Sequence, residues 1–405
     1  MRHIYGIHLM MALTGTLAGC WSGEPPIVNL GIDDTYSIYR MSPLILHPEY
    51  PGDEYVWTMK DCAGADSVIS RERDLYFVRK DVGEYTVKLQ IIDRYNPVEH
   101  QVNIKVWEED VAYSAYISTV HEYHPAPGQF INELPKFEEG DNVESMRLKA
   151  EESISGKNDV MISLGNYGGY VIFSFDHTVV NVHGQYDFKI HGNAFYASSN
   201  PNPSVTDAGG SSEPGIVMVS QDLNGNGIPD DPWYELAGSE YHSPATLHGY
   251  SVSYYRTPQG HIPTPGLNTS ITDTSYILYK GSDGVDGYVE KNTFHTQDYW
   301  PKWLNDDIMT FSGSRLAPNA VDESHKGSYY VLYAYPWGYV DNHPNEKGDL
   351  SSFNIGWAVD ASGNRVHLEG IDFIKVYTGV NQQCGWLGET STEICRAEDL
   401  HILEQ

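Results

Sequence analysis

The stretch Gly-Glu-Tyr-Thr-Val-Lys-Leu-Gln-Ile at residues 83–91 alternates apolar and polar side chains. A period of two is that of a β-strand with one face buried and the other in water. A second strand-like run, Tyr55-Val56-Trp57, carries a bulky aromatic side chain suited to the space between two sheets. We therefore expect residues 28–107 to form a small β-sandwich.

Residues 108–405 contain further strand-like runs, which turn residues separate at irregular and often long intervals. The runs are 171–175, 215–221, 249–255, 328–335 and 370–378. Only 142–153 has apolar side chains at helical spacing, and we expect Asp141 to cap this helix with Glu144 three residues later. The pattern predicts an all-β chain, in which a large antiparallel jelly-roll sandwich with long loops and one short helix follows the first sandwich.

The chain is strongly acidic. Of its 405 residues, 55 are Asp or Glu and 25 are Lys or Arg, for a formal net charge of −30. This charge repels phosphate, which argues against nucleic-acid binding and against broad contact with anionic lipid headgroups. A hydrophobic content of 40% with 12% aromatic residues is sufficient for a packed core and excludes global disorder.

The first twenty residues indicate export and a lipid anchor. A basic start at residues 1–3 precedes an apolar run at 7–17 that is too short to span a membrane, and Leu17-Ala18-Gly19-Cys20 ends it. This ending resembles the lipobox of bacterial lipoproteins, which implies that residues 1–19 are a signal peptide and that Cys20 is acylated. Residues 20–27 would then link the anchor to the fold. The alternative is an ordinary secretory signal cut after Gly19.

Export sets the redox context of the three other cysteines. Cys384 and Cys395 are close enough in sequence to close a small disulfide loop, which leaves Cys62 as a buried thiol.

One loop, at residues 222–235, has the composition of a calcium site. Side-chain oxygens stand at its positions 1, 3, 5, 9 and 10, and Gly227 at position 6 permits a sharp turn. The loop resembles the calcium loops of thrombospondin type 3 and dockerin-like modules. We expect a structural Ca²⁺, and the alternative is an acidic turn that binds nothing. The candidate ligands are Asp222, Asn224, Asn226, the Ile228 carbonyl, Asp230, Asp231 and Glu235.

Proline-broken aromatic runs at 299–303 and 333–339 are the candidates for ligand binding. Rings held in loops suit flat ligand faces such as pyranoses or a large macrocycle, and the alternative is that they pack beneath the loops. The candidates are Trp300, Trp303, Tyr335, Trp337 and Tyr339. The sequence has no Gly-x-Ser-x-Gly, Walker or HExxH motif. Asp187 and Glu213 flank strands, where a structural role is favoured over a catalytic one.

Several runs also resemble a known family. Gly83-Glu84-Tyr85 and Asp93 resemble the ends of a strand in PKD domains, which are Ig-like spacers. Long runs at 163–171, 175–179, 187–195, 213–220, 222–235, 371–378 and 388–393 are similar to PKD-containing cell-surface lipoproteins of gut Bacteroidota.

This resemblance implies a non-enzymatic protein, anchored by lipid in the outer membrane and displayed at the cell surface. It implies that the protein captures a nutrient for a TonB-dependent transporter, with cobalamin (vitamin B12) as the leading ligand. The first alternative is a glycan-binding surface protein, and the second is a glycoside hydrolase with an unrecognised carboxylate pair.

Overall fold

The computed structural model describes residues 29–60, 64–93, 97–158, 160–197 and 209–403. The expected signal peptide, the acylated Cys20 and the thiol of Cys62 lie outside these residues. Within them, none of the helices is both long and apolar enough to cross a membrane.

The N-terminal unit is a sandwich of two sheets around a single core. Its larger sheet has the order β1-β7-β6-β3-β4 and its smaller sheet pairs β2 with β5. Trp57 is fully buried at its centre, and Val87, Leu89 and Ile91 of β6 point into the same core, which confirms the alternation expected at 83–91. The strands are β1 (Thr35–Tyr39), β2 (Leu44–Leu46), β3 (Glu54–Lys60), β4 (Asp66–Ser70), β5 (Leu75–Phe77), β6 (Gly83–Ile92) and β7 (Val98–Trp107).

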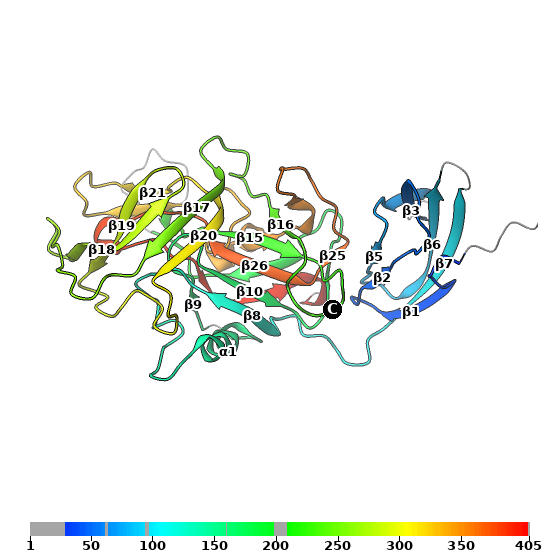
Figure 1. Cartoon of the computed structure of the whole chain (residues 1–405), viewed down its shortest axis with the longest axis horizontal. Helices are drawn as coiled ribbons and strands as arrows, with labels where there is room; N and C mark the ends of the chain where they lie inside the picture. The colour runs from blue at the N-terminus through cyan, green and yellow to red at the C-terminus, as the bar shows by residue number, and fades with distance from the viewer. Residues whose placement is uncertain (1–28, 61–63, 94–96, 159, 198–208, 404–405) are drawn as a thin grey trace, which may run out of the picture.

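A six-stranded antiparallel sheet forms the centre of the second part of the chain, with the order β24-β16-β15-β26-β10-β8. A four-stranded sheet, β19-β18-β17-β20, lies beside it at one end of the molecule (Figure 1). One apolar core joins the two sheets. Their strands are β8 (Thr119–His124), β10 (Tyr170–Ser174), β15 (Gly215–Ser220), β16 (Trp233–Leu236), β17 (Leu247–Tyr255), β18 (Ile271–Gly281), β19 (Asp286–Asn292), β20 (Ile308–Arg315), β24 (Ala358–Val359) and β26 (Phe373–Thr378).

Smaller antiparallel sheets surround this centre, in the orders β13-β14-β22-β21, β23-β12-β28, β11-β25 and β27-β9. The chain is therefore all-β, as the sequence predicts. The strands are β9 (Ile162–Ser163), β11 (Val179–Val180), β12 (Phe188–His191), β13 (Phe195–Tyr196), β14 (Gly209–Ser211), β21 (Ala320–Asp322), β22 (Tyr330–Tyr333), β23 (Ser352–Phe353), β25 (Gly370–Ile371), β27 (Glu393–Ile394) and β28 (Arg396–Asp399).

The expected helix is present as α1 (Val143–Ile154), with Met146, Ala150 and Ile154 buried. Its cap differs from the expectation. Asn142 is the capping residue rather than Asp141, and Ser145 rather than Glu144 completes the capping box. The other helical segments are short: η1 (Asn345–Ser351), η2 (Ile355–Trp357), η3 (Gly385–Leu387) and α2 (Leu400–Leu403).

The two parts of the chain are docked against each other through a polar contact and an apolar one. Tyr76 of the sandwich donates to Asp372 Oδ2 at 2.6 Å, and Arg79 pairs with Glu369 at 2.6 Å. Beside them, Met41, Tyr76 and Val180 belong to a small buried cluster that both parts share. Figure 1 shows β5 facing the end of the larger part at which β25 lies.

Candidate functional site

A cavity of about 490 Å³ opens in the larger part of the chain, among β14, β22, η3 and the loop that follows β19. Several aromatic rings stand in its walls. Phe195 and Phe294 are 57% and 61% exposed, and the ring of Trp386 lies 5.7 Å from that of Phe294, edge to face. The other lining residues are Gln129, Phe130, Asn193, Ala197, Gly210, Ser211, Glu213, Asn292, His295, Tyr329, Tyr330, Val331, Leu332, Cys384, Leu387, Glu389, Thr390 and Glu393.

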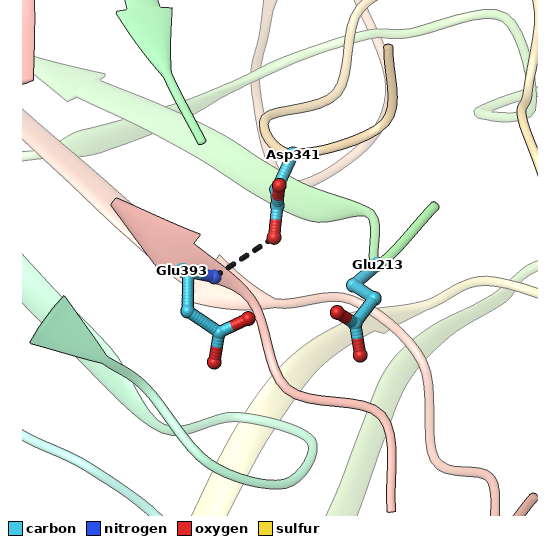
Figure 2. Close-up of side chains that lie close together, drawn as sticks. All are labelled: Glu213, Asp341 and Glu393. Carbon is cyan, nitrogen blue, oxygen red and sulfur yellow. Dashed lines mark hydrogen bonds between the residues drawn. The ribbon is translucent and has the colours of Figure 1, made fainter. Parts of the chain in front are cut away.

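Carboxylates gather at the base of this cavity. Glu213 and Glu393 line it, and Asp341 lies close to both of them (Figure 2). One oxygen of each residue lies within 4.8 Å of the other two. The three come from separate segments: Glu213 precedes β15, Glu393 begins β27, and Asp341 stands in the loop after β22. The fold thus brings together acids that are far apart in the sequence.

Asp341 holds these segments together through its own hydrogen bonds. Its Oδ1 accepts from the backbone N–H groups of Asn193 and Ala194, both at 2.7 Å, and its Oδ2 accepts from Glu393 N at 3.0 Å. Its backbone carbonyl accepts from Glu213 N at 2.8 Å. A φ of 55° places its backbone in the left-handed region, which aspartate tolerates better than most residues.

Burial and mutual repulsion raise the pKa values of these carboxyl groups. Desolvation, followed by the charge of Asp341, raises the pKa of Glu213 to about 8. Desolvation raises the pKa of Asp341 to about 7, against the three backbone N–H groups that lower it. The pKa of Glu393 lies well above its usual value because of burial and the charges of Glu213 and Asp341. Perturbed acids of this kind in a cavity are typical of functional sites.

A fourth acid, Glu389, lines the same cavity and is 3% exposed. Burial raises its pKa to about 7, although Oε1 accepts from Gln129 N at 2.5 Å. Its Oε2 has no hydrogen-bond partner among the described residues. A buried carboxylate oxygen without a partner is costly, so it marks a position where a ligand would be stabilising.

The loop at 222–231 folds back on itself through hydrogen bonds within the turn. Asp222 accepts from Asn226 N at 3.1 Å and from Gly227 N at 2.8 Å, while Asn224 and Asn226 both donate to Asp230. Asp231 accepts from Leu223 N, and its own pKa is raised first by desolvation. Asp222, Asn224, Asn226, Asp230 and Asp231 thus share one small exposed turn, to which Ile228 adds a backbone carbonyl.

Glu235, the seventh expected calcium ligand, is elsewhere. It lies on β16 and accepts from Ser314 Oγ at 2.6 Å. Because β16 continues away from the turn into the sheet, its side chain reaches the core and not the loop. Burial raises its pKa to about 7.

We expect Glu235→Gln to stabilise the protein above pH 7. The folded pKa of about 7 exceeds the usual glutamate pKa of about 4.5, so the native state holds an extra proton between these pH values. The free energy of unfolding therefore falls as pH rises through this window. Glutamine removes this cost and still accepts from Ser314, so we expect a gain of about 2–3 kcal/mol at pH 8 and little change at pH 4.

Chemical denaturation at the two pH values measures this difference, with the exposed Glu54→Gln as the control. An equal effect of Glu235→Gln at both pH values would contradict the assignment.

The aromatic candidates from the sequence do not line the cavity. Trp300, Trp303 and Tyr339 are at most 5% exposed and belong to the main core. Tyr335 packs against that core, and Trp337 is 38% exposed with its ring 4.6 Å from that of Trp357. Buried rings cannot stack on a ligand, so the packing alternative describes most of this set.

The expected disulfide is also absent, because the structure does not join Cys384 to Cys395. The Cys384 sulfur lies 3.7 Å from Thr390 Oγ1, and the Cys395 sulfur lies 3.6 Å from the Gly192 carbonyl. Both side chains are buried. A short separation in the sequence is therefore not sufficient to predict a disulfide between these two cysteines.

Sequence reasoning considered Glu213 but did not select Asp341, Glu389 or Glu393. The available signal was the run at 388–393, where two glutamates stand four apart among small hydroxyl residues. Such a run is unusual for a buried segment, and here Ser391 donates to Glu393 at 2.8 Å. Segments that are far apart in the sequence, at 193–195, 213 and 389–393, meet around the cavity.

Comparison with known proteins adds little. No known family model matches the chain, and no curated protein matches it. Among solved structures, the chain is similar to a SusE-like protein, with 10% identity and a TM-score of 0.21 over 91% of this chain and 95% of the other. At this TM-score the likeness supports no argument about function.

Proposed function

We propose that this protein is a lipid-anchored surface protein that binds the end of a glycan in the aromatic cavity. The observation that carries the proposal is the combination of exposed rings at the mouth with buried carboxylates at the base. Rings with accessible faces stack on the apolar faces of pyranoses. Carboxylate oxygens accept hydrogen bonds from sugar hydroxyl groups.

The size and charge of the site favour a small, uncharged ligand. About 490 Å³ lies within the usual range for small-molecule sites, roughly 300–1,000 Å³. The acids at the base, together with a net charge of −30, repel phosphorylated, sulfated or carboxylated molecules. Cobalamin, the ligand implied by the family resemblance, has a macrocycle much wider than a pyranose, and most of it would remain outside the cavity.

The anchor and the partner belong to the same proposal. The lipobox-like run ending at Cys20 supports acylation and retention at the outer membrane, and the family resemblance supports a TonB-dependent transporter as the partner. The protein would hold the ligand at the surface and release it to that transporter.

Binding of neutral oligosaccharides should depend on Trp386. We expect saturable heat on titration of a glycan identified by array screening, at one equivalent. Trp386→Ala should weaken binding at least tenfold, about 1.4 kcal/mol, because it removes a stacking ring. Trp107→Ala, at an exposed tryptophan of the sandwich, is the matched control and should bind as the unmodified protein does.

Three results would count against the glycan site. Absence of binding across the array would remove the proposal, and heat with cyanocobalamin alone would favour the ligand implied by the resemblance. Loss of glycan binding in Trp337→Ala but not in Trp386→Ala would place the ligand on the loop aromatics.

The 222–231 loop, we further propose, binds a structural Ca²⁺. Its support is the convergence of oxygen side chains on one turn, a donor set that suits a hard cation. Excess chelator should lower the melting temperature of the unmodified protein by several degrees, because the ion binds the folded state only. The double variant Asp222→Asn/Asp230→Asn should respond less to chelator, and an equal response would place the stabilising calcium elsewhere.

A glycoside hydrolase is the second candidate, favoured by one observation. Glu213 and Glu393 are close, and their raised pKa values suit a general acid beside a second carboxylate. Release of reducing ends from a bound glycan, lost in Glu213→Gln while binding persists, would identify this activity. Binding without turnover over a day would leave the capture function.

A further inference from the structure

The carboxylates Glu213, Asp341 and Glu393 have the spacing of ligands around one ion. Calcium binds oxygen at about 2.3–2.6 Å, so two ligands on opposite sides of it lie about 4.6–5.2 Å apart. All three oxygens here lie within 4.8 Å of one another, which a single ion between them would satisfy. Figure 2 shows Glu213 and Glu393 approaching from opposite sides, with Asp341 above them.

The leading influences on the pKa values of this cluster are burial and the charges of other acids. Among the groups that shift the pKa values of the three acids, the described residues include no lysine or arginine. Asp341 and Glu393 are 3% and 2% exposed. Several carboxylates buried side by side without a cation are strongly unfavourable when ionised. A bound cation is one way to remove this cost.

Glu389 gives an independent indication of a missing ligand. It is 97% buried and lines the cavity beside Glu213 and Glu393, and its charge contributes to the raised pKa of Glu213. Its Oε2 accepts no hydrogen bond within the described part of the chain. A water molecule bound to an ion at the base, or a ligand held there, would supply the donor that this oxygen lacks.

We infer that Glu213, Asp341 and Glu393 bind a divalent cation that prefers oxygen ligands, with Ca²⁺ as the first candidate, at the base of the cavity. The Oδ1 of Asp341 accepts two backbone N–H groups, whereas Oδ2 accepts only that of Glu393, so Oδ2 is the Asp341 oxygen with backbone-free acceptor capacity for an ion. Three carboxylates leave further positions of a six- to eight-coordinate ion open toward the cavity.

These open positions deepen the proposed function. Vicinal hydroxyl groups of a sugar can complete the coordination of such an ion, while the rings of Phe294 and Trp386 contact the rest of the ligand. This use of the ion depends on the proposed glycan function, whereas the cation site itself does not.

The test is calorimetric titration of CaCl₂, MnCl₂ and MgCl₂ into the chelator-treated full chain in mild detergent. The Asp222→Asn/Asp230→Asn background removes the contribution of the 222–231 loop. We expect one equivalent of cation to bind to this background. Adding Glu213→Gln, or separately Glu393→Gln, should weaken that binding at least tenfold. Adding Glu235→Gln, the matched control at a half-buried glutamate outside the cavity, should leave it unchanged.

Absence of binding by the background for all three cations would overturn the inference, as would unaltered affinity in both Glu213→Gln and Glu393→Gln. Circular dichroism checks that each variant is folded. If the glutamate variants unfold, anomalous scattering from crystals of the unmodified protein grown with Mn²⁺ decides the question. A peak between the three acids supports the site, and an empty position there refutes it.

Repeating the glycan titration with and without chelator separates the two proposals. Cation binding without glycan binding would retain the ion site and remove the proposed function. Glycan binding by a protein that takes up no cation would retain the proposed function and remove the ion site.

Discussion

The carboxylate of Asp341 is the constraint on which the site depends. It accepts hydrogen bonds from backbone N–H groups of the 192–194 segment and of β27. The backbone carbonyl of Asp341 accepts a further hydrogen bond from the N–H group of Glu213. Through its side chain and its backbone carbonyl, Asp341 therefore links three distant segments to its own loop. A β-carbon at position 192 would collide with Asp341, so this position requires a glycine. The same contacts bring acidic side chains close together, and these side chains make the base of the cavity acidic.

Much of the fold could be predicted from the sequence, because strand patterns are local. The alternation in β6 and the helical spacing at α1 both depend on side chains a few residues apart, and both are present in the structure. The turn at 222–231 could be predicted for the same reason, because its oxygen-bearing side chains and its glycines are close together in the sequence. Glu235 was assigned wrongly because residue spacing does not show where a turn ends and a strand begins.

The cavity could not be predicted, because its residues meet only in the folded chain. Nothing near Asp341 in the sequence points to Glu393, and the exposed rings of Phe195 and Phe294 lie outside the conspicuous aromatic runs. The conspicuous aromatic runs suggested a site instead, but Trp300 and Trp303 fill the core between sheets. A run of aromatic residues is as typical of a packed core as of a binding site, and only the burial of the side chains distinguishes these two roles. The expected disulfide illustrates the same limit, since geometry and not sequence separation decides which sulfurs meet.

The docking of the N-terminal sandwich has a consequence for how far the cavity stands from its attachment point. Asp372 accepts from Tyr76 of the sandwich, from Thr178 and from the backbone of Asp222, so one carboxylate joins both parts of the chain to the acidic turn. β19, next to the cavity, lies at the end of the molecule farthest from the sandwich (Figure 1). For a chain tethered at Cys20, as proposed, the docked sandwich would stand between the anchor and the cavity. The length of the two docked parts would then add to the height at which the cavity meets its ligand.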